Sequence, residues 1–308
     1  MMASWWRRWR DGTGFFLAEP AWLKVMGSMS PAEIMRLPYT DRHHAKQGRS
    51  TGRLILQHDG QTIPVYLKRH YRFSWLEKIR ALIAPKSAWS PAWLEWEHLQ
   101  WARTQGIPVP EALAVGQWYG PGLQCRSYLA LRELSGQKAI NELLPFVKKA
   151  WPSRLFQCWW RSALVEIARL ARLMHDLHHY HKDLYLCHFY APETILTQPS
   201  VIKQGQVRLI DLHRLTYHPL TGHYWRIKDL AQLLYSSYLP EIVAQDRVRF
   251  FRAYLGVRKL TKTQRSLARV ILIKANRYLD HNLARDRQKH ALPSVEQPVQ
   301  SDFSNPAA

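Results

Sequence analysis

The stretch that decides the fold reads His181-Lys182-Asp183-Leu184-Tyr185-Leu186-Cys187-His188, and Ile210-Asp211-Leu212-His213 follows it along the chain. Each stretch holds one aspartate among polar residues, and the second comes directly after the apolar run Val207-Arg208-Leu209-Ile210. Phosphoryl transfer needs one carboxylate near the acceptor hydroxyl and another on a metal ion. The order of Asp183 and Asp211 therefore supplies one candidate for each role.

The first stretch parallels the catalytic loop of protein kinases, H-R-D-L-x-x-x-N. Asp183 is then the predicted catalytic base, and His181 and Lys182 support the loop. His188 stands where kinases carry a metal-binding asparagine, and an imidazole can also bind a metal, so we predict it as a second ligand. The alternative is that Asp183 only caps a turn.

The second stretch stands where the metal-binding aspartate of D-F-G follows a strand. Asp211 is therefore a predicted metal ligand, and His213 takes a supporting place beside it. Further on, Asp229 stands at the start of a predicted helix and resembles the buried aspartate that holds a kinase catalytic loop. The alternative for Asp229 is a simple acidic residue that the helix dipole favours.

A lysine for the nucleotide phosphates is predicted in the first half of the chain. Asp59-Gly60 is a strong hairpin signal, and the strand after it alternates, with Lys68 on the face opposite its aliphatic residues. Ser90-Pro91 then opens a helix with a cap and a proline at its first position. Glu95 on that helix is the predicted partner of Lys68, and Glu97 is the rival.

Two glycines precede the hairpin. Gly48 and Gly52 bracket a turn that we predict to cover the nucleotide phosphates, although a full G-x-G-x-x-G is not present. With Lys68 and Glu95 they form the predicted nucleotide-binding set.

The order of the predicted elements is strands with one helix, a junction at Ser135-Gly136, a long helix, the catalytic loop, a small hairpin and further helices. This order predicts an α+β, bilobal, protein-kinase-like fold, with a small β-rich N-lobe and a mostly helical C-lobe. We expect an entry segment over residues 1–45, an ATP-binding N-lobe over 46–134, a catalytic and acceptor-binding C-lobe over 135–286, and a disordered tail over 287–308.

Composition limits the classes of protein. Hydrophobic residues make up 46% of the 308, which excludes global disorder, and no run is long enough to span a membrane. The chain has three scattered cysteines without a C-x-x-C pair, as expected in a reducing cytosol. A structural zinc site among the histidines near the catalytic loop is an alternative, but their spacing is not that of a standard ligand set.

The formal net charge of +21 predicts a polyanionic partner: nucleic acid, anionic lipid or a phosphorylated glycolipid. Fourteen tryptophans, several of them beside arginines in the first ten residues, favour contact of the entry segment with a membrane surface. The alternative is that these are ordinary core and surface aromatics. Nucleic acid is not expected, because no concentrated basic helix or recognisable nucleic-acid motif is present.

These motifs leave the function open between a kinase for a small-molecule or protein substrate and a basic, non-catalytic binding protein such as a pseudokinase. The fold alone does not fix the substrate. Retention of Lys68, Asp183 and Asp211 speaks against a pseudokinase.

In combination, the motifs resemble those of the lipopolysaccharide kinases, the WaaP and Kdo-kinase family, over about residues 15 to 285. The loop from His181 to Phe189 resembles H-R-D-x-Y-x-C-H-F, with lysine in place of arginine, and Ile210 to Arg214 matches I-D-L-H-R. Trp225 to Leu230 resembles W-x-x-K-D-L, and Glu95-Trp96 resembles the E-W helix before a G-I-P-x-P stop.

The resemblance implies an ATP- and Mg²⁺-dependent kinase whose acceptor is an inner-core sugar of lipopolysaccharide, carried on lipid A. A heptose is favoured over Kdo, because the loop with Tyr185, Cys187 and His188 is closer to that of the heptose kinases. It also implies a cytoplasmic enzyme, peripheral on the cytoplasmic face of the inner membrane of a Gram-negative bacterium.

Overall fold

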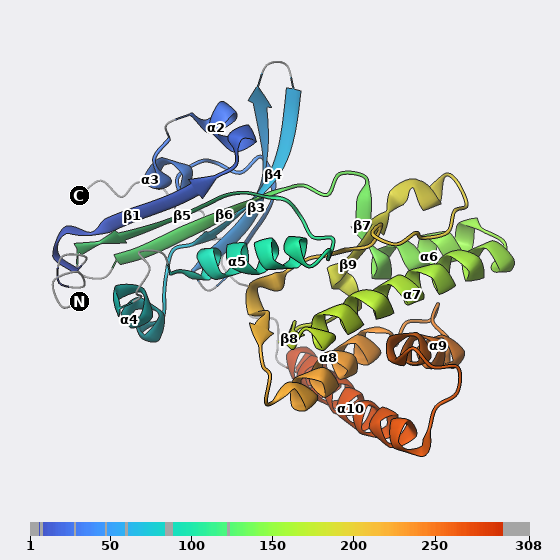
Figure 1. The fold of residues 1–308 in the computed structure, drawn as a ribbon. Coiled ribbons are helices and arrows are strands. Elements are labelled where there is room, and N and C mark those ends of the chain that lie inside the picture. The colour runs from blue at the N-terminus through green and yellow to red at the C-terminus, as the bar shows by residue number, and fades with distance from the viewer. Residues whose placement is uncertain are drawn as a thin grey trace.

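The computed structural model describes residues 6, 9–27, 29–46, 48–58, 61–83, 89–121 and 124–291. A sheet-containing lobe and a helical lobe meet at the centre of the molecule, as Figure 1 shows. The α+β architecture therefore follows the predicted order, with the strands first and most helices after the junction.

The N-lobe contains a six-stranded antiparallel sheet in the order β1-β5-β6-β4-β3-β2. Its strands are β1 (Thr13–Ala18), β2 (Asp41–Lys46), β3 (Arg49–His58), β4 (Gln61–His70), β5 (Ala112–Gly120) and β6 (Gln124–Arg132). The predicted hairpin is β3 and β4, in a register that sets Thr51 opposite Lys68. Its predicted turn, Asp59-Gly60, lies outside the described residues.

The two faces of β4 have different neighbours, as its alternation predicts. Val65 and Leu67 are fully buried in a cluster with Trp22 and Ile34, which come from the short helices α2 (Pro20–Met26) and α3 (Pro31–Ile34). Lys68 points to the opposite face, where α5 (Pro91–Thr104) crosses the sheet (Figure 1). The capping predicted for α5 is present, because Ser90 accepts a hydrogen bond from the backbone N–H of Trp93.

The segment 1–45 contributes to this sheet and is not separate from it. β1 pairs along its whole length with β5, from Thr13 opposite Tyr119 to Ala18 opposite Ala114, and β2 pairs with β3. The described part of the predicted entry segment therefore supplies both edge strands of the N-lobe. Residue 45 lies inside β2, so no structural boundary falls there.

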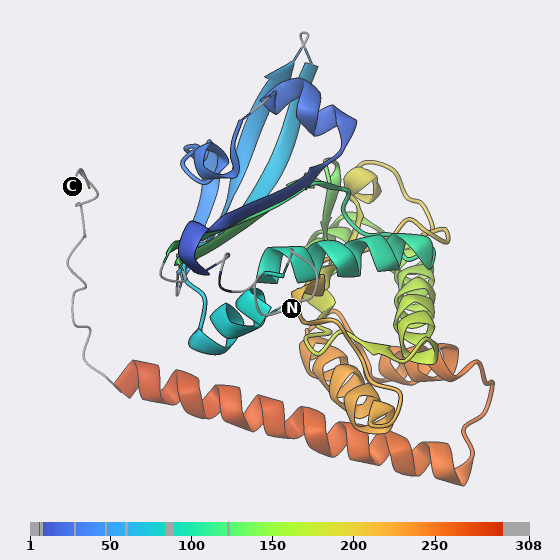
Figure 2. The ribbon, with the colours of Figure 1, turned by 60° about the vertical axis from the view of Figure 1, so that its left-hand side comes forward.

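The C-lobe packs helices around one large apolar core. They are α6 (Ile140–Ala150), α7 (Ser153–Asp176), α8 (Gly222–Ser236), α9 (Ala244–Leu255) and α10 (Lys262–Ala291). The predicted long helix is α7, and its Trp159, Trp160 and Ile167 are almost fully buried in that core. In Figure 2, α10 is the long helix along the lower edge of the molecule.

Short elements join the two lobes and form the loops of the site. They are β7 (Gln137–Ala139), β8 (His179–Tyr180), β9 (Phe189–Pro192), β10 (Arg208–Leu209) and β11 (Thr216–Tyr217), with 3₁₀ turns η2 (Leu186–His188), η3 (Glu193–Leu196) and η4 (Leu212–Arg214). The predicted small hairpin between the two motifs consists of β9 and β10, and Ile195, where its first strand was expected, lies after β9 in η3.

The C-terminal end also differs from the prediction. A disordered tail was predicted from residue 287, but α10 continues to Ala291, and residues 292–308 lie outside the described part of the chain. Within the described residues, no helix combines the length and apolarity that crossing a bilayer requires.

Candidate active site

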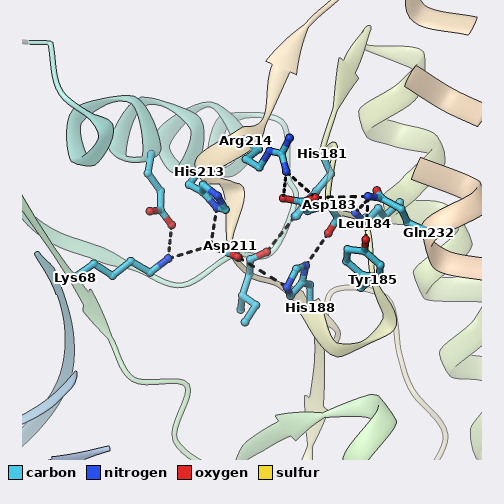
Figure 3. Close-up of polar contacts among 12 residues, drawn as sticks. Lys68, His181, Asp183, Leu184, Tyr185, His188, Asp211, His213, Arg214 and Gln232 are labelled. Carbon is cyan, nitrogen blue, oxygen red and sulfur yellow. Dashed lines mark hydrogen bonds and ion pairs between the residues drawn. The ribbon is translucent and has the colours of Figure 1, made fainter. Parts of the chain in front are cut away.

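Lys68 lies between two carboxylates at the junction of the lobes (Figure 3). Its Nζ is 2.6 Å from Oε1 of Glu95 on α5 and 3.2 Å from Oδ1 of Asp211. Burial disfavours its charge, but the charges of Glu95 and Asp211 outweigh burial and raise the pKa of Lys68 above its ordinary value. Lys68 therefore stays cationic. Glu97, the rival partner, is exposed and makes no contact with it.

Asp211 stands two residues after the end of the short strand β10 and directly before η4, in a left-handed backbone conformation with φ of 64°. Its Oδ1 accepts from Nδ1 of His213 at 2.9 Å as well as from Lys68. Burial opposes ionisation, but the hydrogen bond from His213 and the charge of Lys68 hold the pKa of Asp211 well below its ordinary value. The group is therefore a carboxylate at any physiological pH.

His188 faces the other oxygen of Asp211. Its Nδ1 is 2.7 Å from the backbone carbonyl of Asp183, and since a carbonyl only accepts, Nδ1 carries a proton. In the neutral ring Nε2 then holds a lone pair, and it lies 3.8 Å from Oδ2 of Asp211. Two acceptors that face each other at this distance suit a cation between them.

The side chains around Asp211 suit a magnesium ion, which keeps phosphate and water ligands, better than a metal that is held by side chains alone. Among the described residues, no group of three or more histidine, cysteine, aspartate and glutamate side chains is close enough to hold a metal. Mg²⁺ in nucleotide sites takes one or two protein ligands and completes its shell with phosphate oxygens and water. Asp211 supplies one such carboxylate, with His188 as a second acceptor beside it, and no ligand set for zinc is found among the described residues.

Asp183 lies in the catalytic loop, and side chains of the C-lobe hold it in place. Arg214 Nη1 donates to both of its carboxylate oxygens, at 3.0 and 2.9 Å. Nε2 of Gln232 on α8 lies 3.5 Å from Oδ1 and also donates to the hydroxyl of Tyr185. Asp183 is therefore oriented from two sides, while 19% of its side chain stays open to solvent.

Asp229 holds the catalytic loop from beneath. It is fully buried in the middle of α8, which begins at Gly222, so the prediction that Asp229 stands at the start of this helix is wrong. Its carboxylate accepts the backbone N–H groups of His181 and Lys182, both at 2.8 Å. His175 on α7 lies 3.3 Å from the same carboxylate. Lys182 takes a left-handed backbone conformation, with φ of 65°, and the two bonds to Asp229 hold it there.

His181 connects the two motif-bearing loops. The side chain is fully buried, and its Nε2 lies 3.1 Å from the carbonyl of Ile210, the residue before Asp211. Burial lowers the pKa of His181, so the ring is neutral. The side chain of Lys182 leaves the loop and lies 4.2 Å from the ring centroid of Trp225. These residues thus support the site rather than facing the nucleotide.

The predicted glycine turn is only partly present. Gly48 follows β2 with a positive φ of 74°, which favours glycine, and it is the turn residue. Gly52 does not bracket this turn: it lies inside β3, opposite Leu67, and a Cβ there would clash with the ring of Tyr39. Its role is close packing of Tyr39 on the sheet, not approach to a phosphate.

A nucleotide-sized cavity of about 410 Å³ opens beside Lys68. Residues of the lobe junction line one end, including Glu133 and Leu134, and Lys68, His188 and Asp211 line the other. Apolar Leu99 and Leu131 also line it, as a purine ring requires. The cavity therefore has room for a nucleotide, with apolar side chains to suit a base and Lys68 to suit the phosphates.

Three residues of the site were not predicted from the sequence: Arg214, Gln232 and His98. Nδ1 of His98 on α5 lies 2.8 Å from the carbonyl of Leu212, which ties the helix of Glu95 to the loop of Asp211. Gln232 stands three residues after Asp229, on the same side of α8, and Arg214 directly follows the second motif. These sequence positions were the signals from which Gln232 and Arg214 could have been predicted.

The two-lobed fold, with a lysine–glutamate pair, a metal-type aspartate and a loop aspartate around one cavity, defines a kinase-like phosphotransferase. A family model agrees: the chain belongs to the lipopolysaccharide kinase (Kdo/WaaP) family, whose model matches residues 42–254. It is therefore a lipopolysaccharide core sugar kinase, as the sequence motifs predicted.

Two curated relatives are similar over most of their length. The lipopolysaccharide core heptose(I) kinase WaaP of Pseudomonas aeruginosa is 28% identical over 241 residues, which are 77% of this chain and 85% of the relative. The enzyme of the same name from Escherichia coli K12 is 24% identical over 216 residues, 69% of this chain and 78% of the relative.

A solved structure described as WaaP in complex with acyl carrier protein superimposes with a TM-score of 0.64. At 22% identity it covers 85% of this chain and 98% of its own chain. This likeness confirms the predicted fold.

Proposed function

We propose that this kinase transfers the γ-phosphate of ATP, with Mg²⁺, to a heptose hydroxyl of the lipopolysaccharide inner core. The observation that carries the proposal is the shared network in which Lys68 bonds to both Glu95 and Asp211 while Asp183 stays open to solvent. The names of both curated relatives, heptose(I) kinases, support heptose over Kdo.

Each group has a separate task in the transfer. Lys68, held cationic by its two carboxylate neighbours, binds the phosphates of the nucleotide. Asp211 and His188 would hold a metal ion, which would supply positive charge to neutralise the phosphate oxygens. Asp183 orients the acceptor hydroxyl and takes its proton, and Arg214 keeps that carboxylate aligned.

The place of action follows from the acceptor and the charge. Lipopolysaccharide is membrane-anchored through lipid A, and a net charge of +21 attracts an anionic bilayer surface. We propose a peripheral enzyme on the cytoplasmic face of the inner membrane. The segment 46–134 is its nucleotide-binding part, and 135–286 supplies the catalytic loop and the acceptor side.

Asp183→Asn tests the mechanism. The amide keeps the shape but cannot take a proton, so kcat should fall by about 10² to 10⁴, the range for loss of a general base. Asp176→Asn is the matched control, since Asp176 is a half-exposed aspartate of the same lobe, paired with Arg172. Near-normal turnover of a folded Asp183→Asn variant would refute the assigned base.

Mass spectrometry of the lipopolysaccharide core tests the acceptor. Cells that lack the gene should lose one phosphate, and fragmentation should map it to a heptose. Loss of a phosphate from Kdo instead, or an unchanged core, would refute the heptose assignment. Neither result would bear on the role of Asp183 as the base.

A further inference from the structure

Helix α4 (Trp75–Ile83) carries its large apolar side chains on the outside. Relative exposure is 67% for Trp75, 51% for Leu76, 40% for Ile79 and 65% for Ile83. Helical surface residues of a soluble lobe are usually polar, and isolated exposed apolar residues need no explanation, but four on one nine-residue helix form a patch. Such a patch indicates a surface that binds a membrane or another protein.

The orientation of α4 is fixed by both its cap and its inner side. Ser74 and Glu77 form reciprocal hydrogen bonds at the start of the helix, the backbone N–H of Ser74 donating to Glu77 at 2.7 Å. On the inner side Ala81 is almost fully buried in a small cluster with Phe73 and Tyr119. The helix therefore cannot turn its apolar face inward without losing these contacts.

The geometry of the outer face suits a bilayer surface. Trp75, Ile79 and Ile83 are spaced four residues apart and share one side of the helix, with Leu76 next to them. A short helix of this kind lies in the interface plane with its apolar side chains in the boundary between headgroups and acyl chains. A tryptophan is the side chain preferred at that depth.

The charges around the patch favour an anionic bilayer, and not a second copy of the chain, as the binding partner. Lys78 and Arg80 lie on α4 and Arg72 lies just before it, while the one acid of the helix, Glu77, is held at the cap. Two chains with a net charge of +21 each repel, whereas an anionic lipid surface attracts these cations. The patch thus fits an anionic membrane.

Beside its apolar face, α4 also borders the active site. Glu77 and Arg80 line a cavity of about 540 Å³, which Arg49 and Arg214 also line and which reaches Asp211. This cavity adjoins the nucleotide cavity, and Lys68, Glu95 and Asp211 line both. Figures 1 and 2 show α4 beside the first turn of α5, at the periphery of the N-lobe.

We propose that the outer face of α4 anchors the enzyme in an anionic lipid bilayer and so holds the mouth of this cationic cavity at the bilayer surface. Trp75, Leu76, Ile79 and Ile83 enter the interface, and Lys78 and Arg80 bind the headgroups. That this bilayer presents the acceptor rests on the proposed function; the anchoring itself does not.

Co-sedimentation with vesicles tests the anchor, in the absence of ATP and acceptor. The vesicles are phosphatidylcholine alone or mixed with phosphatidylglycerol, and the variant is Trp75→Ser with Ile83→Ser. Two of the four apolar side chains are then lost, and binding to the mixed vesicles should weaken by at least about tenfold, ~1.4 kcal/mol. Circular dichroism shows whether the variant is folded.

The matched control is Val165→Ser with Ile273→Ser, two apolar side chains of the C-lobe that are exposed by 58% and 56%. It should bind within about twofold of the unchanged chain. Lys78→Gln with Arg80→Gln should reduce the preference for phosphatidylglycerol.

Three results would overturn the proposal: unchanged vesicle binding by the α4 variant, equal loss in the control, or no binding of the unchanged chain to mixed vesicles. A fall in molar mass by light scattering in the α4 variant would assign the patch to a second copy instead. A failed anchor leaves the phosphate mapping intact, so the two proposals fail separately.

Discussion

Replacement of Asp229 by alanine removes the carboxylate that holds the catalytic loop. The buried side chain accepts two backbone N–H groups at 2.8 Å, from His181 and Lys182, and lies 3.3 Å from Nε2 of His175. In Asp229→Ala these donors lose their acceptor inside the C-lobe, where the carboxylate is fully shielded from solvent. Both the stability of the lobe and the position of Asp183 should suffer.

The magnitude follows from the contacts. A hydrogen bond to a charged group contributes about 1.5 to 3 kcal/mol, so loss of the two backbone bonds costs about 3 to 6 kcal/mol. Relaxation of the left-handed Lys182 returns about 1 kcal/mol or more of strain. The expected loss in free energy of unfolding is therefore about 2 to 5 kcal/mol.

Urea unfolding followed by circular dichroism measures this loss, provided that the slope of the transition is unchanged. Asp176→Ala is the control, because the ion pair of Asp176 with Arg172 is half exposed and contributes under about 1 kcal/mol. A loss below about 1 kcal/mol in Asp229→Ala would refute the view that these bonds hold the loop. So would full activity, because the bonds position Asp183.

Three further results are expected. Asp211→Ala should abolish Mg²⁺-dependent turnover, and an unchanged response to Mg²⁺ titration would contradict the ligand role. His188→Asn should retain more activity than His188→Ala, because an amide oxygen can still bind a metal; equal kcat in both would show that His188 is no ligand. His70 is buried, and burial lowers its pKa to about 3 in the folded protein. In the unfolded chain the imidazole has its ordinary pKa of about 6.5, so below that pH it binds a proton in the unfolded state that it cannot bind in the folded state. Stability is therefore lost toward pH 3, and His70→Leu should lessen the drop in melting temperature between about pH 7 and about pH 5.

Local patterns made much of the fold predictable. The alternation of β4, the cap of α5 and the helical spacing of α7 each depend on neighbours in the chain, and each lies where it was predicted. The lysine–glutamate pair was also predictable, because Glu95 and Glu97 differ in which side of α5 they occupy and only the side of Glu95 faces the sheet.

What the sequence did not predict depends on pairing over long distances. β1 is too short to be identified alone, and only its register with β5, about a hundred residues later, makes it a strand. Arg214 reaches Asp183 across the two loops, so neither motif by itself predicts the contact. Gly52 was assigned to a phosphate turn because glycine pattern alone does not reveal the ring of Tyr39 above it.

The layer formed by β1, α2 and α3 has a consequence for where the enzyme can be cut. Trp22 and Ile34 cover Val65 and Leu67 on the face of the sheet behind Lys68. A catalytic fragment designed to start at residue 46, just before the recognisable motifs, would expose that apolar face to water and leave both β5 and β3 without their outer partner strands, which favours aggregation. A soluble fragment of this kinase should therefore include β1, α2 and α3, although these elements precede every residue with a chemical role in the site.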